Sequence, residues 1–238
     1  MISTMESMLR INALNQYYGQ SHSLWDIDLN IPKGQCTCIL GRNGVGKTTL
    51  VQSIMGLAPN ISGQIHFESY ELVGLPVEKR APLGIAYIPQ GRQIFSQLTV
   101  DENIRTGFFA SRARYNKVPD FIYDLFPVLA SMSKRRGGDL SGGQQQQLAI
   151  ARALVLDPTL LLMDKPAEGI QPTIVKEIGE VIKQLVQEKN MTVVLVEQKL
   201  PFARSVGNYY AILDRGRLMV EGRMMDLDNT VIRKYLTV

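Results

Sequence analysis

The stretch of sequence that decides the fold is Gly41-Arg42-Asn43-Gly44-Val45-Gly46-Lys47-Thr48. It fits G-x-x-x-x-G-K-[ST], a pattern in which a glycine-rich loop turns its backbone N–H groups toward phosphate oxygens. In such a loop we expect Lys47 to reach the β- and γ-phosphates of a nucleotide and Thr48 to offer its hydroxyl to Mg²⁺. The stretch therefore predicts a nucleotide-binding P-loop, and a plain strand-to-helix turn is the alternative interpretation.

The residues on either side of the loop provide the setting that the pattern needs. Residues 36–40, Cys-Thr-Cys-Ile-Leu, predict a short buried strand, and residues 49–55 predict a helix that ends at Gly56. This order places the N-terminus of a helix, which is the positive end of its dipole, against the phosphates.

Apolar runs with the length of strands alternate with helical patterns along much of the chain. Residues 160–164 and 192–196 predict core strands, and the first of them delivers Asp164 to the carboxyl edge of a sheet. Further elements are expected as β structure at 9–31, strands at 64–68 and 84–90, a helix after Pro172, and a hairpin at 210–220. This alternation around a P-loop predicts an α/β fold with a mainly parallel sheet and an N-terminal antiparallel β part.

The middle of the chain has a different character. Residues 91–152 predict a mostly helical subdomain inserted into a nucleotide-binding core formed by residues 1–90 and 153–238, all within one domain. Thr99 and Glu102 have the spacing of a capping box, and Ser141 can cap a helix that runs from Gln144 to about residue 156.

Composition excludes several classes of protein. The chain has 238 residues, of which 45% are hydrophobic and 20% charged, as expected for a globular protein with a substantial core. Its two cysteines and two histidines form no metal motif, so we expect reduced core thiols in a cytosolic protein. Residues 1–10 contain Glu6 and no apolar core, and the longest apolar run, residues 209–213, is far shorter than the roughly 20 residues of a membrane span. We therefore expect neither export nor a direct membrane span.

A second glycine-rich motif, Leu140-Ser141-Gly142-Gly143-Gln144, precedes a predicted helix. It matches the signature of the ATP-binding subunits of ABC transporters, which other P-loop proteins lack, and the whole chain resembles that family in the order of its motifs. Gln90 matches the glutamine of the family's Q-loop, and Tyr18 matches the aromatic residue that stacks on adenine. The resemblance implies a P-loop NTPase core of the ABC ATPase type.

Shorter stretches resemble one group within that family, the branched-chain amino-acid uptake group. Residues 87–92, 168–172 and 196–198 are similar to this group as a whole, and residues 136–139, 144–147 and 235–238 are most similar to its urea-transport member. No residue of this chain would touch urea or an amino acid, because in the family the cargo site belongs to other subunits.

The resemblance implies a homo- or heterodimer of such subunits, bound to transmembrane permease subunits and lying on the cytoplasmic, inner face of the cell membrane. ATP and Mg²⁺ are the implied cofactors, with Thr48, Gln90 and Asp164 as metal ligands. The implied nucleotide-binding residues are Tyr18, Gly41, Arg42, Asn43, Gly44, Val45, Gly46, Lys47, Thr48 and Thr49 and, toward the partner's nucleotide, Ser141, Gly142, Gly143 and Gln144. The implied catalytic positions are Lys47, Gln90, Asp164, Lys165 and Gln198.

One of these positions departs from the family pattern. The family places a glutamate directly after the aspartate, where it positions or deprotonates the attacking water, and this chain has Lys165 there. An ammonium group is no base at neutral pH, and loss of a general base typically lowers the rate by about 10²–10⁴-fold. We therefore expect ATP binding to persist or tighten and hydrolysis to be weak. An engineered, mutated or misread position is the alternative interpretation, since one base change converts a glutamate codon to a lysine codon. Gln198 occupies the position of the family's switch histidine, where this group commonly has glutamine, so Gln198 is no departure from the group's pattern.

Two other function classes remain as alternatives to a transporter ATPase. A nucleotide-dependent nucleic-acid clamp shares the signature, but the chain has no long heptad insertion, no zinc cysteines and no second cassette, so no nucleic acid is expected as a partner. A non-hydrolysing regulatory cassette is favoured only by Lys165.

Overall fold

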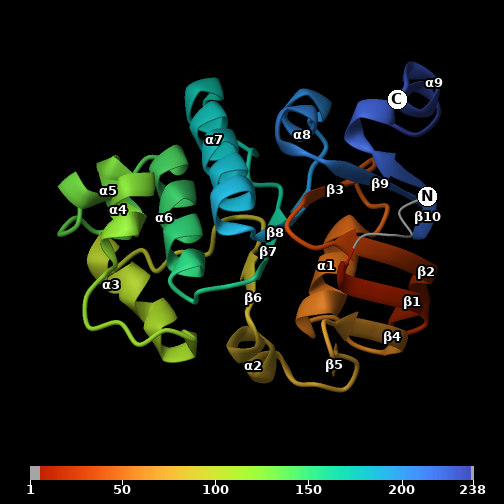
Figure 1. Cartoon of the computed structure of the whole chain (residues 1–238), viewed down its shortest axis with the longest axis horizontal. Helices are drawn as coiled ribbons and strands as arrows, with labels where there is room; N and C mark the ends of the chain where they lie inside the picture. The colour runs from red at the N-terminus through yellow and green to blue at the C-terminus, as the bar shows by residue number, and fades with distance from the viewer. Residues whose placement is uncertain (1–5, 237–238) are drawn as a thin grey trace.

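A computed structural model describes residues 6–236. Part of the N-terminal stretch considered for export, and the last two residues of the 235–238 pattern, lie outside the described residues. The helices α3–α6 gather at one end of the molecule, and strands β1, β2 and β4 lie at the other end, together with β9 and β10. Helix α7 and strands β6, β7 and β8 lie between the two ends (Figure 1).

The N-terminal β part is a four-stranded antiparallel sheet with the order β2-β1-β4-β5. Its strands are β1 (Ser7–Tyr18), β2 (Ser21–Pro32), β4 (Ile61–Phe67) and β5 (Tyr70–Glu71). In β1, Leu9 pairs with Ile31 on one side and with Phe67 on the other, and all three side chains are buried. The predicted antiparallel β part is therefore present, and β4 begins three residues earlier than the sequence suggested.

The second sheet has six strands in the order β10-β9-β3-β8-β7-β6. They are β3 (Cys36–Leu40), β6 (Ile85–Ile88), β7 (Leu160–Asp164), β8 (Thr192–Val196), β9 (Tyr209–Asp214) and β10 (Arg217–Arg223). Strands β9, β3, β8, β7 and β6 run parallel, while β10 pairs antiparallel with β9 as a hairpin. The mainly parallel sheet is confirmed, and its carboxyl edge carries the ends of β3, β7 and β8 together.

The helices of the inserted segment are shorter than the sequence suggested. The α-helices within residues 6–236 are α1 (Lys47–Met55), α2 (Val77–Arg80), α3 (Val100–Arg105), α4 (Asp120–Leu125), α5 (Pro127–Ser131), α6 (Gly142–Leu154), α7 (Pro172–Lys189), α8 (Leu200–Val206) and α9 (Asn229–Tyr235). Between α3 and α4 the chain forms a 3₁₀ turn at Thr106–Ala110 and then irregular backbone. Pro119 and Pro127 explain part of the difference. Each proline stands at the start of a helix, and a helix formed by the residues before it cannot continue past it.

Two hydrophobic clusters pack on opposite faces of the parallel sheet. Cys36, Cys38 and Leu40 belong to the cluster that includes α6, α7 and α8, whereas Ile39 belongs to the cluster shared with α1 and the antiparallel sheet. This assignment follows the period of two along a strand. Both cysteines are free and fully buried, as predicted for core thiols.

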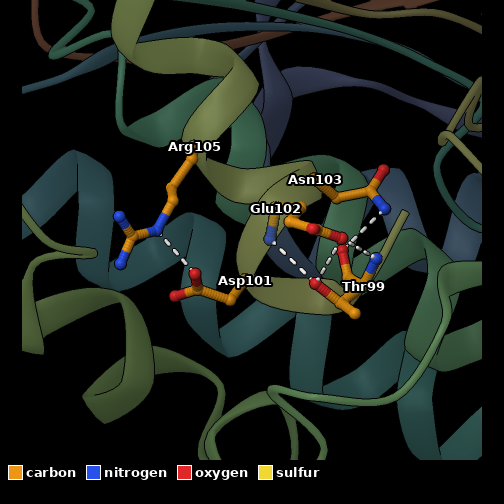
Figure 2. A network of polar contacts seen from close by, with 5 residues as sticks. All are labelled: Thr99, Asp101, Glu102, Asn103 and Arg105. Atoms are coloured by element: carbon orange, nitrogen blue, oxygen red, sulfur yellow. Dashed lines mark hydrogen bonds and ion pairs between the residues drawn. The ribbon is translucent and has the colours of Figure 1, made fainter.

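The capping box predicted at the start of α3 is confirmed (Figure 2). The Thr99 hydroxyl accepts a hydrogen bond from the Glu102 backbone N–H, and the Glu102 carboxylate accepts one from the Thr99 N–H at 2.8 Å. The buried Asn103 amide donates to the carbonyls of Phe95, Leu98 and Thr99, and its oxygen accepts from the Phe95 N–H. Asn103 therefore fixes the loop that leads into the helix.

A buried arginine joins the end of α1 to the segment after β5. The Arg80 side chain is 1% exposed and donates to the Ser53 and Ile54 carbonyls in the last turn of α1 and to the carbonyls of Leu72 and Leu75. No described carboxylate forms an ion pair with it. Its charge is thus compensated by backbone carbonyls, including the negative end of the α1 dipole.

Candidate nucleotide-binding site

The P-loop connects β3 to α1, as the sequence predicts. The strand ends at Leu40, and the helix begins at Lys47 after Gly46, two residues earlier than expected. Gly41 has φ +145°, and a Cβ there would lie 2.4 Å from the Leu213 carbonyl oxygen, so no other residue fits without moving β9. The glycines therefore allow the loop to pass between the parallel sheet and the helix.

Lys47 is held inside the loop. Its side chain is 4% exposed, and Nζ donates to the carbonyls of Gly41 at 2.8 Å and Arg42 at 2.6 Å. Burial, together with repulsion from Lys165, lowers the pKa of Lys47 from 10.5 to about 8 against the attraction of Asp164 and Glu197. The ammonium group is thus poorly compensated, and a phosphate oxygen would stabilise it.

A cavity of about 420 Å³ lies over the loop, and we call it the P-loop cavity. Its described lining residues are Ser21, His22, Ser23, Asn43, Gly44, Gly46, Lys47, Thr48, Thr49, Lys165, Arg215 and Gly216. Five of the eight P-loop residues thus share one cavity with Thr49 and Lys165, while Gly41, Arg42 and Val45 belong to the loop without lining the cavity. The site residues that sequence reasoning missed are those of the β2 start and the β9–β10 turn.

The β9–β10 turn reaches the cavity through backbone hydrogen bonds. The Gly216 N–H donates to the Val45 carbonyl at 3.0 Å, and the Gly216 carbonyl accepts from the Trp25 N–H at 2.8 Å. This turn thereby brings Arg215 beside the P-loop. Because these contacts join distant segments, no local motif could have identified Arg215.

Tyr18, the expected adenine-stacking residue, ends β1 and is 44% exposed. Its hydroxyl donates to the Gln52 side-chain oxygen at 3.2 Å, and Tyr18 does not line the P-loop cavity. The neighbouring rings of Tyr17, His22 and Trp25 form a stack with centroid spacings of 4.1 and 3.5 Å. The role of Tyr18 toward adenine stays a prediction.

Asp164 stands at the end of β7 with both carboxylate oxygens buried and without a hydrogen bond of normal geometry. Burial raises the pKa of Asp164, while the nearby Thr48 hydroxyl, Lys165 and Lys47 lower it and Glu168 raises it further. Unpartnered carboxylate oxygens beside a threonine hydroxyl are the hard oxygen donors that Mg²⁺ prefers. Residues 6–236 hold no group of three or more His, Cys, Asp or Glu side chains able to bind a metal, so further ligands would come from phosphate or water.

Gln90, the third predicted metal ligand, is engaged elsewhere. Its Nε2 donates to the Glu168 carboxylate at 2.7 Å. This bond links the segment after β6 to the loop after β7, two stretches that the sequence did not connect. The Gln90 oxygen remains the atom that could face a cation.

Lys165 extends from the loop after β7 toward the P-loop. Its backbone has φ +50°, its N–H donates to the Val196 carbonyl at 2.9 Å, and its Nζ donates to the Asn43 side-chain oxygen at 3.4 Å. A neighbouring cavity of about 400 Å³ is lined by Lys165, Glu168, Gly169, Glu197, Gln198 and Lys199. Gln198 is exposed in it, while the buried Glu197 carboxylate accepts from the N–H groups of Gln198 and Lys199. The structure therefore brings Lys165 and Gln198 together at the edge of the P-loop site.

The signature motif forms the start of α6. Ser141 is the N-cap, its hydroxyl accepts from the Gln144 N–H, and the Gln144 side chain accepts from the Ser141 N–H at 2.9 Å. Residues 141–144 line a different cavity, of about 490 Å³, with Gly169 and Ile174. Among the described residues, the signature motif does not line the P-loop cavity, so one chain does not present both motifs to one ligand.

Comparisons with known proteins agree with this geometry. Residues 24–168 match the family described as ABC transporter. The chain belongs to this family, and its fold and motifs are those of the ATP-binding domain. In the part of the chain that the structure describes, no helix has the length and apolarity to cross a bilayer.

The relatives make the placement within the family more specific. The chain is 40% identical over 214 residues to the high-affinity branched-chain amino acid transport ATP-binding protein BraG of Pseudomonas aeruginosa, covering 90% of this chain and 91% of the relative. It is 37% identical over 221 residues to the probable branched-chain amino acid transport ATP-binding protein LivF of Archaeoglobus fulgidus, covering 92% and 94%. A nucleotide-free ATP-binding cassette from an ABC transporter superposes with TM-score 0.82 at 25% identity, covering 97% of this chain and 95% of that structure.

Proposed function

We propose that this chain is the ATP-binding subunit of an ABC importer and that it energises the uptake of a small polar solute. The observation that carries the proposal is the P-loop cavity, in which a buried and poorly compensated Lys47 lies beside Thr48 and the α1 N-terminus. Branched-chain amino acids are the favoured cargo because two relatives that match about nine-tenths of the chain carry that name. Urea is the second cargo, supported by residues 136–139 and 144–147.

The working unit would be a homo- or heterodimer attached to transmembrane permease subunits on the inner face of the membrane. Support comes from the separation of the P-loop cavity and the signature motif into different cavities of one chain. A second subunit would then place its Ser141, Gly142 and Gly143 donors, at a helix N-terminus, over the γ-phosphate. A cassette of the same fold, 24% identical with TM-score 0.81, is dimeric in a post-hydrolysis state with ADP and phosphate.

Thr48 and Asp164 would hold Mg²⁺, and the unpartnered Asp164 oxygens support this assignment. Held there, the ion would supply positive charge that offsets the negative charge of the phosphates. Gln90 would join the ion or its water by exchanging its bond to Glu168, and that exchange would report the γ-phosphate to the segment leading into α3.

We propose that hydrolysis at this chain's own P-loop is weak because no carboxylate takes the place of the missing glutamate. Lys165 lines the cavity and contacts Asn43. The two neighbouring carboxylates are already engaged, since Glu168 accepts from Gln90 and Glu197 accepts from two backbone N–H groups. Lack of a general base typically lowers the rate by about 10²–10⁴-fold. In a heterodimer the signature motif of this chain could still complete the partner's site.

The test compares ATP turnover of the purified chain with its Lys165→Glu and Lys165→Gln variants, with ATP binding measured in parallel. If Lys165→Glu hydrolyses ATP faster than both the unsubstituted chain and Lys165→Gln, the result supports weak hydrolysis at this chain's P-loop. Equal rates of all three proteins refute weak hydrolysis caused by Lys165. Absence of ATP binding by the unsubstituted chain refutes the nucleotide-binding function itself. Uptake of branched-chain amino acids and of urea into vesicles that contain the complex co-purified from membranes then decides between the two cargoes.

A non-hydrolysing regulatory cassette is the second candidate, and the same Lys165 contact favours it. Tight ATP binding without turnover by the assembled complex, with uptake still sensitive to ATP binding at this subunit, would support this second function.

A further inference from the structure

The P-loop cavity is strongly cationic. Three of its described lining residues, Lys47, Lys165 and Arg215, carry positive side chains, and none of the described lining residues is an aspartate or glutamate. Asp164 lies behind this wall, since it is 1% exposed and is not among the lining residues. A polyphosphate entering the cavity would therefore meet ammonium and guanidinium groups before it met a carboxylate.

Lys165 is placed to act on the phosphates directly. The hydrogen bond from its backbone to Val196 and the bond from its Nζ to the Asn43 amide oxygen orient it toward the loop. Asn43 is a neutral partner, and no described acidic group forms an ion pair with Lys165 within 4.0 Å. Because no described carboxylate is in direct contact with the ammonium group, the group remains available to pair with phosphate oxygens.

The substitution of lysine for glutamate also changes the charge of the cavity. It replaces a negative with a positive group, so the site gains about two units of positive charge, as many as one Mg²⁺ ion carries. In a partly enclosed site this charge acts on the ligand with less screening than it would at an open surface.

We infer that Lys165 substitutes electrostatically for the divalent cation during binding, so that this chain binds metal-free nucleoside triphosphate about as tightly as the magnesium complex. The inference rests on the proposed nucleotide-binding function and concerns binding alone. Lys165 acts here as a specificity-determining residue that selects the charge state of the ligand. Arg215 and Lys47 contribute positive charge under either condition.

The experiment measures the Kd of the full chain for ATP by titration with a fluorescent ATP analogue and by competition with ATP, once with excess Mg²⁺ and once with a chelator. For the unsubstituted chain the two Kd values should agree within about threefold or the metal-free value should be lower. For Lys165→Glu, chelation should weaken binding by at least about tenfold, with Lys165→Gln in between. Lys176→Gln, which removes an exposed lysine of α7 outside the described lining of the P-loop cavity, is the matched control and should behave as the unsubstituted chain.

If chelation weakens the unsubstituted chain and Lys165→Glu equally, or weakens neither, the inference is overturned, because metal dependence is then independent of residue 165. If Lys176→Gln changes the ratio as much as Lys165→Gln, the effect is one of net charge and the inference is also overturned. If the unsubstituted chain binds ATP under neither condition, the proposed nucleotide-binding function fails instead.

Discussion

Replacing the buried Arg80 by methionine should destabilise the fold, because the end of α1 and the segment after β5 would lose the side chain that joins them. Methionine is an unbranched apolar side chain that reaches as far as the arginine Nε, so the substitution keeps the apolar stem while it removes every guanidinium N–H. Arg80 makes five hydrogen bonds of 2.5–3.0 Å to four backbone carbonyls, and the Ser53 and Ile54 carbonyls would lose their donor at the end of α1.

The magnitude follows from opposing effects. Bonds from a charged donor contribute about 1.5–3 kcal/mol each, but burial of the guanidinium, which lowers the pKa of Arg80, opposes them. Breaking a buried charged network usually lowers the free energy of unfolding by about 3–5 kcal/mol. In a domain of this size that corresponds to a decrease in Tm of about 6–20 °C.

The assay is urea unfolding followed by circular dichroism, with Lys79→Met as the control. Lys79 precedes Arg80 on the same short helix and is exposed, so its substitution should change the free energy of unfolding by no more than about 0.5 kcal/mol. Arg80→Lys keeps the charge without the planar fork and should fall between the two. Arg80→Met within about 1 kcal/mol of Lys79→Met would refute the assignment of a stabilising network to Arg80.

Lys47, Gly63 and Asn103 are three further residues whose perturbation should have a measurable effect. ATP affinity should fall as the pH rises through about 8, because neutral Lys47 no longer attracts phosphate. The free protein should gain stability from about pH 8 up to 10.5, where only the unfolded lysine keeps its proton. A Kd for ATP that stays constant up to about pH 9.5 would contradict the lowered pKa of Lys47. Gly63→Ala should lower the free energy of unfolding by at least about 2 kcal/mol, because a Cβ at residue 63 would lie 2.3 Å from the Ala13 carbonyl oxygen. The control is Gly74→Ala, since Gly74 has a similar positive φ but open space around it. This variant should lower the free energy of unfolding by only about 1 kcal/mol in the same urea titration. Asn103→Ala should lower it by about 2–3 kcal/mol, because the Phe95 N–H and three carbonyls lose a buried partner, and a cost below about 0.5 kcal/mol would exclude that role.

Local patterns in the sequence were sufficient for the central elements of the fold. Strands β3, β7 and β8 have the bounds that their apolar runs suggest, and the capping residues Thr99 and Ser141 stand where predicted. These features depend on a few consecutive residues, since a buried strand or a helix cap is specified by its own side chains. The bounds of α4 and α5 could not be predicted in this way, because proline and glycine residues divide the segment between α3 and α6.

The rest of the candidate site depends on contacts between distant residues. Arg215 lines the P-loop cavity only because the β9–β10 turn pairs with Val45, and Glu168 binds Gln90 across 78 positions of sequence. The departure at Lys165 was visible in the sequence, whereas its contact with Asn43, 122 positions away, required the fold. Sequence thus indicated which chemical groups are present, and tertiary structure determined which of them share a cavity.

The burial of both thiols in β3 gives this protein an internal kinetic reporter. Cys36 and Cys38 are the only cysteines of the chain, both are 0% exposed, and they stand in the strand that leads into the P-loop. A thiol reagent can reach them only when the centre of the parallel sheet opens, so the labelling rate under native conditions measures how often that opening occurs. A single cysteine introduced on the surface would react much faster and could carry a spectroscopic probe without removal of the native pair.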